Sequence, residues 1–227
     1  MKNKIFTFIA AFILINAALF SQTVIKQKKH ISFFTGMGIQ YGITPEFRDF
    51  LVASIPYSTS DSIKSFNAGV EFYGGAEFDI SKTISAGVDY SYYIRGLSYV
   101  YSPAVFDYTI TNHQPYLFVN YNLRKQKYNF KFGGSIGYHF QQLDNKINNS
   151  TTLKYTSSGP SFRLNVTFLP KFSENFYVYL GGFAFANMYG KLKDENGEIL
   201  KAPNSTTEAD LKGYGIGARL GILFNIN

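Results

Sequence analysis

The sequence predicts an all-β protein, an eight-stranded antiparallel up-and-down transmembrane β-barrel. Three observations predict it: polar and apolar side chains alternate along about eight segments, the connections between these segments are alternately short and long, and an export signal precedes them. Successive side chains of a strand point to opposite faces, so the alternation gives each strand one apolar and one polar face. Strands that cross a bilayer must close into a barrel, because no water there satisfies an open edge.

The start of the chain has the composition of a secretory signal peptide. Lys2 and Lys4 make it basic, an apolar run fills residues 5–15, and small residues follow. This is the layout of a cleaved export signal. A retained membrane anchor is the alternative, but the run is short for a spanning helix of about 20 residues. We therefore expect a signal peptide at 1–21 and one β-barrel domain at 22–227.

The stretch SFNAGVEFYGGAEFDI shows the alternation most clearly. Phe72 and Phe78 fall on one face, whereas Glu71, Glu77 and Asp79 fall on the other. A soluble barrel would turn the apolar face inward and fill its interior with Phe and Ile. The polar faces of this chain carry many glycines instead, and a ring of about eight strands leaves room for little more than small side chains. We therefore expect the apolar face to contact lipid and the polar face to line the lumen.

The same pattern recurs in seven further segments, and none of them has a helical period. They are residues 30–41, 83–95, 113–123, 128–140, 161–169, 175–189 and 213–226. The segment at 175–189 is apolar on both faces, and we expect Val178, Leu180 and Ala184 to point outward.

The connections alternate in length. Three are short, at residues 79–83, 124–127 and 170–175, and four are long, at residues 42–64, 96–112, 142–157 and 191–210. Short periplasmic turns and long external loops are typical of outer-membrane barrels. An even number of strands then places both ends of the barrel on the periplasmic side.

The export signal, the amphipathic strands and the terminal stretch GYGIGARLGILFNIN together resemble the small outer-membrane β-barrel domain proteins. These are the porin-like or PorT-like proteins, which are similar in architecture to outer membrane proteins A and X. The resemblance covers essentially all of the chain after the signal peptide. It implies a location in the bacterial outer membrane and recognition of the last strand by the barrel assembly machinery.

Eight charged residues take the inward parity, and we expect them to form a charge network in the lumen. They are Glu71, Glu77, Asp79, Asp89, Arg95, Lys131, Arg163 and Arg219. Charges in a confined interior are costly unless they are paired. We therefore expect ion pairs that plug the lumen. The alternative is a narrow pore or proton path, which needs a continuous column of water.

Catalysis is the third alternative, because some barrels of this general kind modify lipid A. His30 and Ser32 share a face, but they lie at the periplasmic start of the first strand, away from the outer leaflet. His139 points inward without an identifiable Ser and acid, and His113 lies at a loop base. A nucleophilic site needs such partners. Cysteine is absent. We expect no catalytic residue, no metal site and no cofactor.

Aromatic residues at the third and fourth strands predict a hairpin that protrudes beyond the membrane. Tyr99 and Tyr101 precede its turn, and Phe106 and Tyr108 follow it. Two interpretations stay open: an exposed aromatic face that binds a partner or ligand, and a face that packs on neighbouring loops. The long segment 193–210 is instead predicted to be a polar, solvated loop.

These observations predict a monomeric outer-membrane protein with a structural or interaction role through its extracellular loops. The alternatives are a narrow channel or an accessory of transport or secretion, and a lipid A-modifying enzyme. Expected partners are outer-membrane lipid, lipopolysaccharide, the barrel assembly machinery and an extracellular or envelope protein. The net charge is +7, but the basic residues are scattered. A nucleic-acid-binding protein would gather them on one face.

Overall fold

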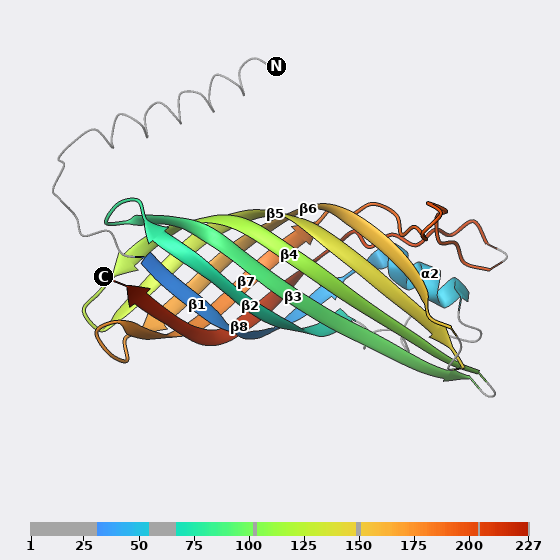
Figure 1. The fold of residues 1–227 in the computed structure, drawn as a ribbon, viewed down its shortest axis with the longest axis horizontal. Helices are drawn as coiled ribbons and strands as arrows, with labels where there is room; N and C mark the ends of the chain where they lie inside the picture. The colour runs from blue at the N-terminus through green and yellow to red at the C-terminus, as the bar shows by residue number, and fades with distance from the viewer. Residues whose placement is uncertain (1–30, 55–66, 102–103, 149–150, 204, 227) are drawn as a thin grey trace, which may run out of the picture.

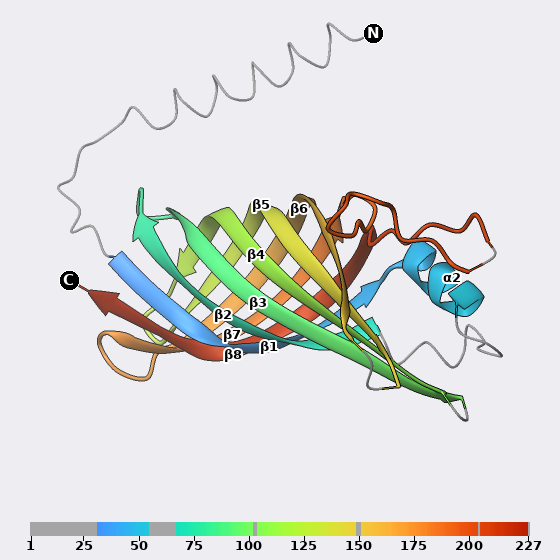
Figure 2. The same ribbon diagram turned by 45° about the vertical axis from the view of Figure 1, so that its right-hand side comes forward.

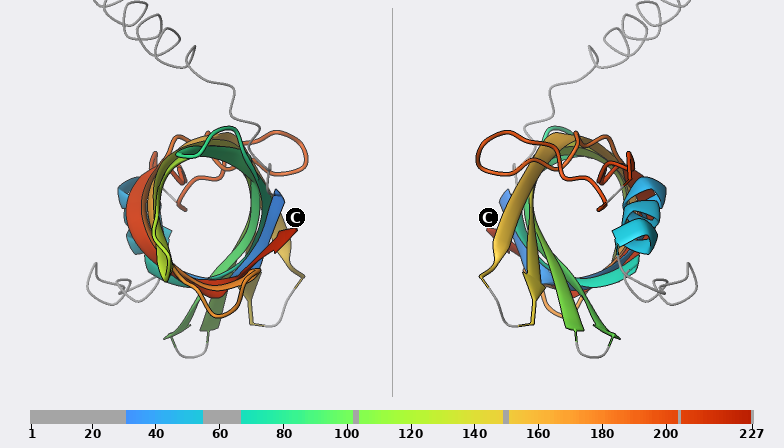
Figure 3. Two further views of the ribbon diagram at one scale, coloured as in Figure 1. Left: turned by 90° about the vertical axis from the view of Figure 1, so that its left-hand side faces the viewer. Right: turned by 90° about the vertical axis from the view of Figure 1, so that its right-hand side faces the viewer.

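A computed structural model describes residues 31–54, 67–101, 104–148, 151–203 and 205–226. The predicted signal peptide, His30 and Phe66 lie outside these residues. Each strand pairs with the next in antiparallel register, and the last strand pairs with the first, so the sheet closes (Figures 1 and 3). The predicted eight-stranded up-and-down barrel is thus confirmed. The strands are β1 Ile31–Ile43, β2 Ala68–Asp79, β3 Ile84–Tyr101, β4 Ala104–Arg124, β5 Tyr128–Ile147, β6 Leu153–Pro170, β7 Phe176–Asn187 and β8 Gly213–Ile226, and the helix is α2 Pro45–Ser54.

The two ends of the barrel differ in their connections. The short turns 80–83, 125–127 and 171–175 lie at the end where β1 begins and β8 ends (Figure 1). The longer connections and α2 lie at the opposite end. Because outer-membrane barrels have short periplasmic turns, we call these the periplasmic end and the extracellular end.

The outer surface is an apolar belt to which every strand contributes. Ile39, Leu117, Ile136, Leu164 and Ile216 are each 59–71% exposed. A soluble domain rarely exposes a continuous apolar surface of this kind, whereas a barrel in a bilayer requires it. No helix in the described part of the chain is long and apolar enough to cross a membrane.

The inward and outward faces follow the predicted parity, including that of β7. Val178, Leu180 and Ala184 point outward, while Tyr179 and Phe183 are buried in the lumen. The prediction for this segment is confirmed. One row of side chains therefore contacts lipid, and the alternate row fills the barrel.

The hairpins at the extracellular end are longer than the alternation of polar and apolar residues indicates. The β3–β4 hairpin continues to the pair Tyr101 and Ala104, as predicted, and extends well beyond the barrel rim (Figure 2). Residues 142–157 were predicted to be a long connection, and this is wrong. There β5 and β6 stay paired as far as Asn145 and Leu153. Beyond the bilayer a strand needs no apolar outer face, so its sequence no longer alternates.

Two clusters of buried apolar side chains form the interior. The lumen cluster lies inside the barrel and consists of Phe34, Tyr73, Phe118, Leu169, Tyr179 and Leu223. The cap core lies at the extracellular end and consists of Phe47, Phe50, Leu51, Leu97, Tyr108, Ile110, Leu143, Tyr189, Leu192, Ala202, Ala209 and Leu211. The segment 193–210, predicted to be a solvated loop, is thus anchored in part by buried side chains.

Candidate functional site

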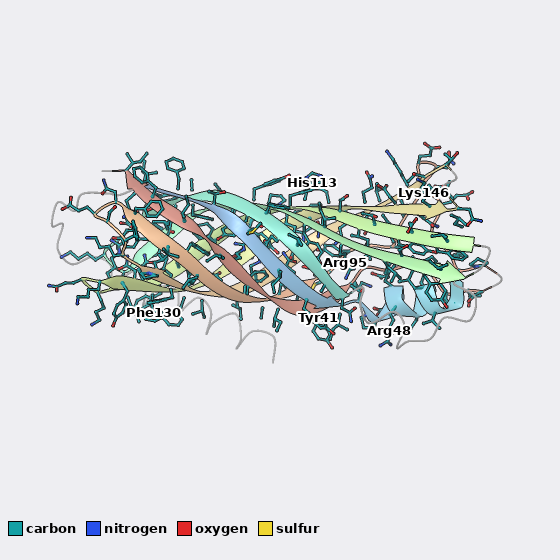
Figure 4. All side chains as sticks on the ribbon, turned by 90° about the horizontal axis from the view of Figure 1, so that it is seen from below. Tyr41, Arg48, Arg95, His113, Phe130 and Lys146 are labelled. Atoms are coloured by element: carbon teal, nitrogen blue, oxygen red, sulfur yellow. The ribbon has the colours of Figure 1, made fainter. Side chains whose placement is uncertain are left out.

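All eight charged residues predicted to point inward are buried, each with 8% exposure or less. They lie at three levels along the barrel. Glu77, Asp79 and Lys131 lie nearest the periplasmic end, and Arg95 lies towards the extracellular end, where Figure 4 shows it within the barrel. The remaining four, Glu71, Asp89, Arg163 and Arg219, meet at mid-height and come from β2, β3, β6 and β8.

Each arginine of the mid-height group binds both carboxylates. Arg219 donates to Glu71 and, over 2.6 Å, to Asp89 Oδ2. Arg163 Nη1 lies 3.3 Å from the same Asp89 oxygen, and its Nη2 lies 3.5 Å from Glu71 Oε1. Hydrogen bonds to Ser91 and Gln114 complete the group. Two positive and two negative charges therefore form a closed ring across the lumen, which we call the central ion cluster.

Aromatic rings flank the central ion cluster. The guanidinium of Arg163 lies 4.2 Å from the ring centroid of Tyr116 and 4.3 Å from that of Phe183. The guanidinium of Arg219 lies 4.4 Å from the centroid of Tyr73. A cation over an aromatic face gains about 2 kcal/mol when it is desolvated. These rings therefore stabilise the arginines and fill the lumen around them.

Little free space remains inside this layer. The hollow between the central ion cluster and the lumen cluster measures about 20 Å³ and is lined by Phe34, Asp89, Phe118, Arg163 and Arg219, among others. A second hollow of about 20 Å³ lies near Arg95, Tyr93 and Tyr189. Each has room for about one water molecule.

Nearer the periplasmic end the lumen widens into an open mouth of about 440 Å³. Lys131 binds Glu77 over 2.6 Å, and Arg124 pairs with Asp79 at the wall of the mouth. Glu77 also accepts a hydrogen bond from Ser85. The inward charges at this level are therefore paired as well, but they border water.

Three of the four aromatic side chains predicted for the β3–β4 hairpin pack inward. Tyr108 is 3% exposed and belongs to the cap core, and Tyr99 and Phe106 pack against it half-buried. The side chain of Tyr101 lies outside the described residues. Burial raises the pKa of Tyr108 to about 12. Of the two interpretations left open, packing on neighbouring loops therefore applies to these residues. They do not form an exposed aromatic face.

The cap core joins four segments that are distant in the sequence. Helix α2 contributes Phe47, Phe50 and Leu51, and the two long hairpins and the β7–β8 connection contribute the rest. Figure 2 shows α2 and the β7–β8 connection side by side at the extracellular end. We call this folded unit the cap.

Neither described histidine has the partners of a catalytic site. His139 is fully buried, and its Nδ1 lies 2.5 Å from Tyr189 Oη. His113 lies on the outer wall, with its Nδ1 2.6 Å from Tyr90 Oη (Figure 4). Ser32 donates to Asn225 at the periplasmic end. The described residues contain no cluster of His, Asp or Glu that could hold a metal ion.

Inward aromatic residues are the part of the site that the sequence analysis missed. Phe34, Tyr73, Phe118, Tyr179 and Phe183 all point into the lumen. Their positions in the alternation indicate that they point inward. Tyr73, for example, is two residues from Glu71 and therefore lies on the same face of β2. The expectation that a narrow lumen holds small residues is therefore only half right. Glycines on the inward parity make room for the large rings.

The closed barrel, its apolar belt and its filled lumen define the class. The chain is a small transmembrane β-barrel of the outer-membrane type, and it resides in the bacterial outer membrane.

No protein-family model and no curated protein matches the chain. Solved structures of outer-membrane barrels do match it. The attachment invasion locus protein Ail of Yersinia pestis, in complex with the heparin analogue sucrose octasulfate, gives a TM-score of 0.53 at 10% identity, over 88% of this chain and 100% of Ail. The outer membrane protein OprG from Pseudomonas aeruginosa gives a TM-score of 0.52 at 7% identity, over 88% of this chain and 97% of OprG. At these identities the likeness concerns the fold.

Proposed function

We propose that the protein is a closed, non-enzymatic outer-membrane barrel that holds a folded cap at the cell surface for interaction with other molecules. The central ion cluster carries this proposal, because it crosses the lumen at mid-height and is packed between aromatic rings. Hollows of about 20 Å³ above and below it are too small to form a continuous column of water. Transport through the lumen is therefore disfavoured.

The cap supports an interaction role over a purely structural one. Its core buries large side chains such as Phe47, Phe50 and Leu143, and each contributes about 1.5–3 kcal/mol on burial. This energy holds the extracellular segments in one shape rather than strengthening the membrane-embedded wall. A surface held in a fixed shape binds a partner with a smaller entropy cost.

Conductance across planar bilayers tests the closed lumen. We expect the refolded wild-type protein to give no reproducible opening events. A variant in which Phe183 and the paired residues Glu71 and Arg219 are all replaced by alanine should conduct, because these side chains occupy the lumen at mid-height and Arg163 and Asp89 remain paired. Reproducible opening events of the wild type would contradict the proposal and favour the narrow channel.

Proteolysis of the refolded protein in lipid vesicles tests the cap. Protease added outside should leave α2 and the described hairpin residues 96–101 and 104–112 uncut in the wild type. We expect cleavage there in Phe50→Ala, because loss of a buried Phe costs about 3–5 kcal/mol. The barrel itself should remain folded, since Phe50 packs only in the cap core among the described clusters. Equal cleavage of both proteins would show that the cap has no fixed shape.

A further inference from the structure

The outer wall of β4, β5 and β6 changes from polar to apolar along the barrel axis. Neighbouring residues in the register form rows that run across the three strands. The row nearest the extracellular end is Thr111, Gln142 and Thr156, and the next row is His113, Phe140 and Ser158. Two rows further towards the bilayer centre lie Leu117, Ile136 and Phe162. All of these side chains have the outward parity.

Two hollows lie one above the other on this wall. The upper hollow measures about 720 Å³. Hydroxyl, amide and basic side chains line it beside apolar surface, among them Thr111, His113, Gln142, Thr156, Ser158, Lys191 and Lys193, together with Phe140 and Ile199. The lower hollow measures about 630 Å³ and is lined mainly by apolar residues: Val88, Leu117, Ile136, Tyr138, Pro160 and Phe162.

The two hollows adjoin at Tyr138. Its hydroxyl lies 3.2 Å from Ser158 Oγ in the upper hollow, and its ring centroid lies 5.4 Å from that of Phe140. Together the hollows form a surface whose upper half carries polar and basic groups and whose lower half is almost entirely apolar. We call it the outer-wall groove.

Lys193 adds a positive charge to the upper half. The β7–β8 connection runs beside β6 there, and the backbones of Lys193 and Thr156 exchange two hydrogen bonds of 2.7 and 3.0 Å. This pairing places Lys193 on the outward face that Thr156 occupies. Among the described residues no carboxylate lies within 4.0 Å of the Lys193 ammonium. Its neighbour Lys191 pairs with Glu208 and lowers the pKa of that carboxyl group.

We propose that the outer-wall groove binds a phosphorylated glycolipid of the outer leaflet. Lys193 has no carboxylate partner within the described part of the chain, and its ammonium suits a phosphate group. The hydroxyl and amide groups of Thr111, Gln142, Thr156 and Ser158 suit the hydroxyl groups of a sugar. The apolar half lies in the belt below and suits acyl chains. The end with the long connections faces the outer leaflet. The headgroup of a lipid in that leaflet therefore lies beside the upper hollow, and its acyl chains lie beside the lower hollow.

The proposal rests on the orientation of the barrel in the membrane and not on whether its lumen conducts. If the groove does not bind the glycolipid, the proposal of a closed lumen still holds. If the lumen conducts ions, the proposal about the groove still holds. A general preference for anionic phospholipids is the main competing outcome, because phosphatidylglycerol also carries a phosphate and acyl chains but no phosphorylated sugar.

Binding of defined lipids to the refolded mature barrel in detergent micelles tests the groove, with native mass spectrometry as the readout. The probes are lipid A with both phosphates, dephosphorylated lipid A and phosphatidylglycerol. We expect Lys193→Gln to bind phosphorylated lipid A roughly tenfold more weakly than the wild type, as loss of one charge-assisted hydrogen bond implies. Dephosphorylated lipid A should bind both proteins equally weakly.

Lys127→Gln is the matched control. It removes the same charge from an exposed lysine in the short turn at the periplasmic end, and it should bind phosphorylated lipid A as the wild type does. Heat-dependent gel mobility verifies that each variant is folded. Unchanged binding by Lys193→Gln would overturn the proposal. Equal binding of phosphatidylglycerol with the same dependence on Lys193 would also overturn it, because the groove would then select any anionic lipid.

Discussion

Replacing Arg219 with methionine is expected to destabilise the folded barrel by about 3–5 kcal/mol, the usual cost of leaving a buried charge without its partner. Arg219 binds both Glu71 and Asp89, and neither carboxylate reaches solvent. The remaining arginine, Arg163, contacts them only over 3.3 and 3.5 Å. Urea unfolding in vesicles measures the effect by far-ultraviolet circular dichroism, which suits a chain without tryptophan.

Two further variants show whether the charge itself is responsible. Arg124→Met removes the partner of Asp79 at the open periplasmic mouth, where the arginine side chain is 34% exposed. Its expected cost is about 1 kcal/mol or less, as for a pair that borders water. Adding Glu71→Gln to Arg219→Met should restore part of the lost stability, because it removes the uncompensated negative charge. If the double variant is less stable than Arg219→Met alone, the central ion cluster does not act as described.

Replacing Gly36 with valine is expected to destabilise the closed barrel at its seam. Gly36 on β1 is paired with Gly221 on β8, at the seam between the first and last strands. A Cβ atom at this position would lie 2.6 Å from Gly221 Cα and 2.7 Å from Tyr73 Oη. The backbone of the seam would have to move. Overpacking usually costs 1–3 kcal/mol, and we expect about 3 kcal/mol here.

The control for Gly36→Val is Gly182→Val. Gly182 lies on β7 and points outward, and a Cβ atom there would have no neighbour within 4 Å. This variant should refold as the wild type does, whereas Gly36→Val should lose most of its heat-modifiable gel band. Equal refolding of the two variants would show that the seam has room for a side chain and that the glycine is not required there.

The alternation along the strands, the connection lengths and the export signal together predicted the fold, and the alternation alone predicted the direction of each inward charge. Glu71 and Phe72 are adjacent in sequence, yet one is fully buried and the other is 48% exposed. This follows from the period of two in a strand. The same reasoning applied to Tyr73 and Phe183 would have predicted the aromatic rings beside the arginines.

The pairing of the inward charges was not predictable. Glu71 and Arg163 lie 92 positions apart on strands that are not neighbours. Which charges meet at one height depends on the stagger of the strands around the barrel, and one sequence does not specify that stagger. The outer-wall groove depends on it too, because Lys193 reaches β6 only through the path of the β7–β8 connection.

Helix α2 had a recognisable start that the sequence analysis did not use. Thr44, Pro45 and Glu46 form a favourable helix beginning, with proline in the first turn and an acid after it. Phe47, Phe50 and Leu51 then recur at helical spacing and are the buried residues of the helix. A short helix inside a long connection was overlooked because the surrounding pattern was that of strands.

Contact between the outward row and hydrocarbon is the claim on which all else depends. The chain has no cysteine, so a spin label can be attached at a single introduced cysteine. Val88 and Ile136 lie in the belt and are 52% and 59% exposed, and Glu198 in the β7–β8 connection serves as the aqueous reference. Labels at Val88 and Ile136 in vesicles should collide often with oxygen and rarely with a water-soluble nickel chelate. Nickel collisions as frequent as those at Glu198 would place this row in water and contradict the account.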